Sequence, residues 1–121
     1  MTVKELHRQA MHHCDKAILY ELAGRPSEAR AEFRLAFEHE RDAALSLTDR
    51  TDAEPTRSIL FRSAAALALD IDDPAEALRL IDLGLRPGAP SEIAAELTAL
   101  RDRAQGELQR DNVISLPVSR G

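Results

Sequence analysis

The feature that most constrains this chain is an apolar stretch near its middle, at residues 54–71. Within residues 59–71 only Arg62, Ser63 and Asp70 are polar. A helix that is apolar on every side is a buried one, and a membrane span would need roughly 20 apolar residues in a row. The stretch therefore predicts a central buried helix, with amphipathic helices packed on its sides and no membrane segment.

The segments on both sides of this stretch show helical periodicity and clear boundary signals. Thr2 is the expected cap of a first helix that ends at Gly24, and Pro26 opens the second helix. Pro74 opens a fourth helix, and the breaker RPGAP at residues 86–90 separates it from a fifth. The predicted fold is all-α, with five antiparallel helices arranged as two long hairpins and a capping helix.

The length and charge of the chain limit the classes of protein to which it can belong. We expect one domain over residues 1–110 and a flexible C-terminal tail at 111–121, where the helical pattern stops. The net charge of −5, from 21 acidic and 16 basic residues, disfavours nucleic acid as a partner. The chain has no signal peptide and one cysteine, which favours the cytoplasm. Its richness in Ala and Arg is typical of a GC-rich bacterial genome.

The chain also contains an internal repeat. When the sequence is shifted by 48 residues, the first two helices fall on the third and fourth, and both copies read Pro-x-Glu-Ala where the second helix of the pair begins. The identities that define this match are Pro26 with Pro74, Glu28 with Glu76, and Ala29 with Ala77. Self-similarity on this scale is typical of stacked helical hairpins.

The spacing of small and bulky residues in each copy resembles that of the tetratricopeptide repeat (TPR). The residues that carry the resemblance in the first copy are Ala17, Tyr20, Gly24, Ala29, Phe33 and Ala36. Those of the second, more degenerate copy are Ala65, Ala68, Asp72, Ala77, Ile81 and Gly84. The resemblance covers residues 10–104 and implies a TPR-like hairpin stack. The 48-residue spacing exceeds the usual repeat of about 34 residues, so the second and third helices are expected to be long.

The resemblance also implies where a partner would bind, because the first helix of each pair lines a concave groove in this family. The partner-binding residues that it implies are Met11, Cys14, Ile18, Glu21, Ile59, Arg62, Ala66 and Leu69. An apolar groove with one arginine suits a peptide or helix that carries an acidic anchor for Arg62. The alternative is that Arg62 pairs within the fold, for example with Glu21. Arg57, one turn upstream, is a weaker candidate for the same surface.

The sequence gives little support for a metal site or a catalytic site. His7, His12, His13 and Cys14 are residue types that bind zinc, but neighbours on a helix point about 100° apart and cannot converge on one ion. The chain has no glycine-rich phosphate loop, no nucleophile elbow and no carboxylate pair at catalytic spacing with a histidine. We therefore expect no metal, no cofactor and no catalytic residue.

Two functions remain after these exclusions. The first is a non-enzymatic adaptor that binds another protein or peptide in the apolar groove. The second is a structural homodimer, or a small subunit of a larger bacterial complex, in which no groove is free. Two repeats are fewer than the three or more that such arrays normally need, which keeps the second function open.

Overall fold

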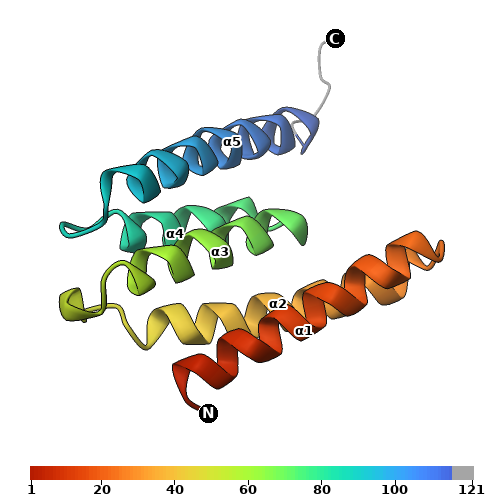
Figure 1. Cartoon of the computed structure of the whole chain (residues 1–121). Helices are drawn as coiled ribbons and strands as arrows, with labels where there is room; N and C mark the ends of the chain where they lie inside the picture. The colour runs from red at the N-terminus through yellow and green to blue at the C-terminus, as the bar shows by residue number, and fades with distance from the viewer. Residues whose placement is uncertain (116–121) are drawn as a thin grey trace, which may run out of the picture.

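The computed structural model describes residues 1–115, with side chains through Asp111, and this part of the chain is helical (Figure 1). The elements, in chain order, are α1 (Val3–Leu22), α2 (Pro26–Leu45), the short 3₁₀ helix η1 (Thr51–Ala53), α3 (Thr56–Asp70), α4 (Pro74–Gly84) and α5 (Ser91–Ser115). The prediction of an all-α fold with five helices is therefore confirmed.

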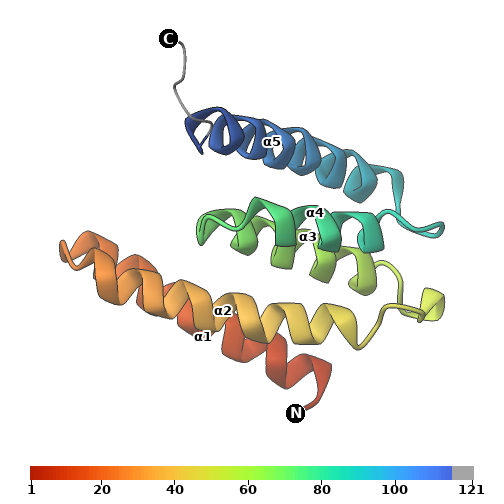
Figure 2. The same ribbon diagram turned by 180° about the vertical axis from the view of Figure 1, so that it is seen from behind.

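The helices form two hairpins, α1–α2 and α3–α4, and α5 lies against the second of them (Figure 1). The hairpins are joined through packing of α2 on α3, while α5 contacts both α4 and α3. The free end of the α1–α2 hairpin extends past α3 and α4, as both views show (Figures 1 and 2). The structure is thus a stack of hairpins whose first member overhangs the second.

The two hairpin turns have the same backbone geometry. In each turn a residue with positive φ, Gly24 at 72° and Asp72 at 60°, follows the end of the first helix. The next residue caps the second helix, with φ −117° and ψ 72° at Arg25, and φ −121° and ψ 72° at Asp73. A proline then occupies the first helical position in both copies. The repeat detected in the sequence is therefore present in the backbone of both turns.

Among the described residues, the central helix α3 supplies more of the hydrophobic core than any other helix. Its buried residues are Arg57, Ser58, Leu60, Phe61, Ala64, Ala65, Leu67, Ala68 and Leu69. The expectation that no face of this helix meets water was too strong, because one narrow strip stays partly or fully exposed. This strip consists of Ile59, Arg62, Ser63, Ala66 and Asp70. Residues of the strip lie at spacings of three or four, so they share one side of the helix.

A glycine allows three helices to pack closely in the core. Gly84, in the last turn of α4, is buried between Phe61 of α3 and Leu97 of α5. A Cβ atom added to Gly84 would lie 2.8 Å from the Cβ atom of Phe61 and 3.1 Å from Cδ1 of Leu97. Three helices therefore meet at a point that has no space for a side chain.

The C-terminal boundary of the last helix differs from the expectation. We expected residues 111–121 to form a flexible tail, but α5 continues through Ser115. The physical reason is that a helix already formed adds residues at little cost until a breaker appears, and the first one here is Pro117. The rest of the expected tail, residues 116–121, lies outside the part that the structure describes.

We predict that Gly84→Ala destabilises the protein by about 1–3 kcal/mol, because overpacking a filled core forces neighbouring side chains or helices apart. Gly106→Ala is the matched control, since a Cβ there would meet only the end of the flexible Arg110 side chain at 3.7 Å. The control should be neutral or stabilising by up to about 1 kcal/mol, from its higher helix propensity. Urea unfolding of both variants measures the difference. Equal stabilities for the two variants would contradict the close contact at Gly84.

Candidate functional site

A groove that contains the predicted site residues Arg62 and Ala66 lies between α3 and α5. It has a volume of about 510 Å³ and is lined by Arg62, Ser63, Ala66, Glu96, Ala99, Leu100 and Arg103. We call the groove that these residues line the α3–α5 groove. Its apolar surface comes from Ala66, Ala99 and Leu100, and charged side chains border it. Such a surface can receive an apolar side chain from a ligand and orient it through charged contacts.

Arg62 forms an ion pair across the α3–α5 groove. Its Nη1 atom donates to both carboxylate oxygens of Glu96, at 3.0 and 3.1 Å. The internal pairing with Glu21, considered as an alternative, is therefore not the one that forms. The side chains of Arg62 and Glu96 are 29% and 53% exposed. An exposed pair contributes only about 0–1 kcal/mol, so a ligand carboxylate can replace Glu96 at little cost.

The predicted residues of α1 do not line this groove. Met11, Ile18 and Glu21 are exposed and Cys14 is half-buried, while α1 itself packs on α2. Ile59 of α3 lies apart from Arg62, in a smaller apolar hollow of about 400 Å³ beside the N-terminal end of α1. The structure thus brings Arg62 and Ala66 together with residues of α5, which the sequence prediction did not include.

Two of the predicted site residues are in the interior. Leu69 is buried in the hydrophobic core. Arg57 is only 1% exposed, so its guanidinium is not on the surface that was predicted to bind a partner. The assignment of these two residues to that surface is therefore wrong, because both point toward the core side of α3 rather than toward its exposed strip.

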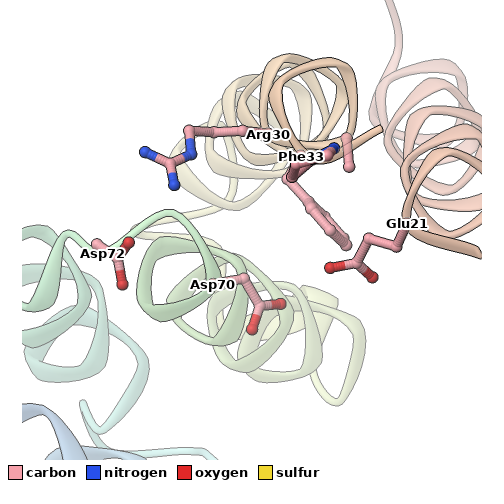
Figure 3. Close-up of a pocket in the computed structure, with 7 residues that line it drawn as sticks. Glu21, Arg30, Phe33, Asp70 and Asp72 are labelled. Carbon is pink, nitrogen blue, oxygen red and sulfur yellow. The ribbon is translucent and has the colours of Figure 1, made fainter. Parts of the chain in front are cut away.

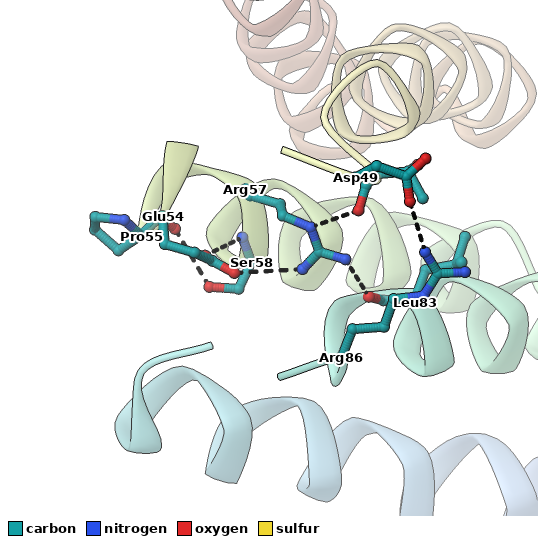
Figure 4. Close-up of polar contacts among 8 residues, drawn as sticks. Asp49, Glu54, Pro55, Arg57, Ser58, Leu83 and Arg86 are labelled. Carbon is teal, nitrogen blue, oxygen red and sulfur yellow. Dashed lines mark hydrogen bonds and ion pairs between the residues drawn. The ribbon is translucent and has the colours of Figure 1, made fainter. Parts of the chain in front are cut away.

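The buried Arg57 joins the ends of three helices (Figure 4). Its Nε atom donates to the carbonyl oxygen of Thr48, 2.9 Å away, just after α2. Its Nη2 atom donates to the carbonyl oxygen of Leu83 in the last turn of α4. Nη1 lies 3.3 Å from Oε2 of Glu54, and the guanidinium carbon is 5.0 Å from the centre of the Phe61 ring. All of these contacts are structural, which assigns Arg57 to the fold.

Glu54 has a second role in the same network. Its Oε1 atom accepts a hydrogen bond from the backbone N–H of Ser58 at 3.0 Å, which caps the start of α3 (Figure 4). Arg86 and Asp49 form an exposed ion pair at 3.1 Å beside it. The spacing of Glu54 and Arg57, three residues apart at a helix start, was a signal in the sequence for this pair. The carbonyl acceptors, 9 and 26 residues away, left no such signal.

We predict that Arg57→Ala lowers the free energy of unfolding by about 3–5 kcal/mol, because it removes a buried guanidinium that donates to the carbonyls of Thr48 and Leu83 and pairs with Glu54. Arg62→Ala is the control on the same helix and should cost less than about 1 kcal/mol. Chemical denaturation of both variants tests the assignment. A strongly destabilised Arg62→Ala, or a stable Arg57→Ala, would reverse the roles given to the two arginines.

Histidines and carboxylates tie α1 to α2. Nδ1 of His7 lies 2.9 and 3.0 Å from the two carboxylate oxygens of the fully buried Glu40. Nδ1 of His13 lies 2.6 Å from Oε2 of Glu32, and Lys16 pairs with the other oxygen at 3.1 Å. Burial raises the pKa of Glu40. The hydrogen bond from His13 lowers the pKa of Glu32. Two of the histidines are therefore engaged in holding the first hairpin together.

A cleft of about 300 Å³ lies between the first hairpin and the α3–α4 turn (Figure 3). It is lined by Glu21, Pro26, Ala29, Arg30, Phe33, Asp70 and Asp72. Burial, together with the negative charges of Glu21 and Asp72, raises the pKa of Asp70. In the described part of the chain, no three His, Cys, Asp or Glu side chains are arranged to hold a metal ion.

The lone cysteine is a poor nucleophile. Burial and the nearby carboxylate of Glu40 raise the pKa of the Cys14 thiol to about 11. Because the thiolate is the reactive form, the thiol stays protonated and unreactive near neutral pH. Cys14 therefore acts as a packing residue between α1 and the core.

We predict that Glu40→Gln changes the pH dependence of stability. A raised pKa means that the folded state holds the Glu40 proton more tightly than the unfolded state, so stability falls as pH rises from about 4.5, the ordinary pKa, through the folded value. The variant should therefore be more stable than the parent at neutral pH, and this advantage should shrink as pH falls toward the ordinary value. Thermal melts of both proteins across this range measure the difference. Parallel curves would show that burial of Glu40 has no net electrostatic cost.

Comparison with known proteins identifies no relative, since no family model, no curated protein and no solved structure matches this chain. Among the described helices, none has the length and hydropathy that crossing a bilayer requires.

Proposed function

We propose that this chain is a non-enzymatic protein-interaction module that holds a helix or peptide of a partner protein in the α3–α5 groove. The observation that carries the proposal is the position of Arg62, which lies at the edge of an apolar groove in a pair weak enough to exchange its carboxylate. An acidic side chain of the partner would replace Glu96, and an apolar neighbour would cover Ala66 and Leu100.

The arrangement of the helices supports the same proposal. The first helix of each hairpin lines the concave side in TPR proteins, and here α3, the first helix of its hairpin, forms the groove together with α5. The equal turns at Gly24 and Asp72 add to this likeness, because they repeat one hairpin geometry along the chain. We propose that the chain is a two-repeat TPR-like module, in which α5 has the place of the capping helix and supplies one wall of the binding site.

The charges around the groove favour an acidic ligand. Arg62 and Arg103 both line it, against Glu96 alone among the acids. Nε of Arg103 is 3.0 Å from Oε2 of Glu107, one turn further along α5. Both arginines pair with carboxylates on α5, of which Glu96 is 53% and Glu107 21% exposed. Each guanidinium has five N–H donors, so it has donors left for a ligand's carboxylate. The composition suggests a bacterial cytoplasm as the setting in which such a partner is met.

Photocrosslinking tests this proposal whatever the identity of the partner. A benzophenone amino acid at Ala99, which is exposed in the groove, should form an adduct with one partner in a lysate of the source organism. The same group at Ala75, which is exposed on α4 and outside the groove, is the matched control. We expect Arg62→Glu to abolish the adduct at Ala99, because it places like charges against the acidic anchor, and Glu96→Gln to strengthen it.

Two results would contradict the proposed function. One is an adduct at Ala99 that persists unchanged in Arg62→Glu. The other is equal labelling from Ala75 and Ala99, which would mean that capture is unrelated to the groove. Far-ultraviolet circular dichroism of each variant separates lost binding from lost folding.

A further inference from the structure

A second surface, on α1, has a regular pattern that the α3–α5 groove does not use. Six exposed residues recur along α1 at alternating spacings of four and three, so they form one stripe on the helix. We call this stripe the α1 seam; it consists of Lys4, Arg8, Met11, Asp15, Ile18 and Leu22. Half of its members are large apolar residues, and Ile18 and Leu22 are 47% and 81% exposed. Large exposed apolar side chains in a row mark an interaction surface.

The charged members of the α1 seam have no partners in the described part of the fold. Arg8 and Asp15 form no hydrogen bond or ion pair with any residue that the structure describes, and the same holds for Lys4 within residues 1–111. This contrasts with Arg25, Arg62 and Arg79, each of which pairs with an acid. The seam therefore has charges available for pairing, with the bases in its N-terminal half and the acid in its C-terminal half.

Two copies of the α1 seam have complementary charges when the second copy runs antiparallel to the first. A two-fold axis midway between Arg8 and Asp15, beside Met11, places each Arg8 opposite the Asp15 of the other copy. Met11 then lies against its own equivalent, and the aliphatic stem of Lys4 covers Ile18 of the other copy. We propose that the α1 seam binds a second copy of this chain, with the two α1 helices antiparallel.

The position of α1 in the fold leaves room for this contact. α1 packs on α2, and the seam lies on another side of the helix from the buried Ala10 and Ala17. Ile18 and Leu22 are in the last two turns of α1. This end of α1 belongs to the part of the first hairpin that extends past α3 and α4 (Figure 2). The seam shares no residue with the α3–α5 groove, so this proposal is independent of the proposed function.

Charge exchange tests the antiparallel dimer directly. Sedimentation equilibrium of the parent chain should show a mass that rises with concentration from 13.4 kDa toward twice that value. Asp15→Arg and Arg8→Asp should each weaken self-association by about tenfold or more, since every seam then opposes a like charge. Mixing the two single variants should restore the dimer, because each chain supplies the charge that the other lacks. The double variant Arg8→Asp with Asp15→Arg should form a dimer by itself, because its two charges are exchanged and remain complementary.

Two further variants supply the apolar test and its control. Ile18→Asp should abolish the dimer, whereas Leu35→Asp, which changes an exposed large apolar residue of α2 outside the seam, should leave it intact. A parent chain that stays monomeric at all concentrations would overturn the proposal. So would a dimer that survives Asp15→Arg, a pair of single variants that fails to associate when mixed, or a dimer lost equally in Leu35→Asp. The mixing experiment keeps the test valid if one single variant proves less stable.

Discussion

The guanidinium of Arg57 is the interaction on which the arrangement of the helices depends. It is buried beside Phe61 and donates to carbonyl oxygens just after α2 and in the last turn of α4. The last carbonyls of a helix have no partners within it, and burying them unpaired is costly. One planar side chain with five donors reaches a carbonyl beyond the end of α2 and one in the last turn of α4, and so links the two hairpins. The close approach of α4 to α3 and α5 at Gly84 lies next to this point.

Two arginines on one helix have opposite roles because of where they point. Arg57 is buried among backbone carbonyls and an aromatic ring, so it is not available to a ligand at the surface. Arg62, five residues later, lies on the exposed strip of α3 and meets a carboxylate that is more exposed than itself. Five residues correspond to about 500° of rotation, which carries a side chain from the core side of the helix to the opposite side. The chemistry is the same in both cases, and burial decides which arginine belongs to the fold and which to the groove.

The sequence predicted the helices well because their signals are local. Proline at the first helical position, a small residue at the turn and apolar residues at helical spacing were enough to place α1 to α4. The groove was predicted less well, since its second wall came from α5 rather than from α1. Periodicity shows that Met11 and Ile18 share a face with one another, but it does not show which helix that face meets. The long-range acceptors of Arg57 could likewise not be predicted from the sequence, because a backbone carbonyl is present at every position and has no signature there.

The overhang of the first hairpin has a consequence for how the molecule opens. α1 is attached to the rest of the fold chiefly through α2, whereas α3 is enclosed by neighbours on several sides. Local unfolding follows such differences in support, and the least supported unit separates first. We therefore expect the α1–α2 hairpin to separate as one unit while the α3–α4–α5 unit stays folded, because α1 is held to α2 and α2 alone forms the main contact with α3. The α1 seam and the α3–α5 groove would then differ in how long each stays folded, as well as in the residues that form them.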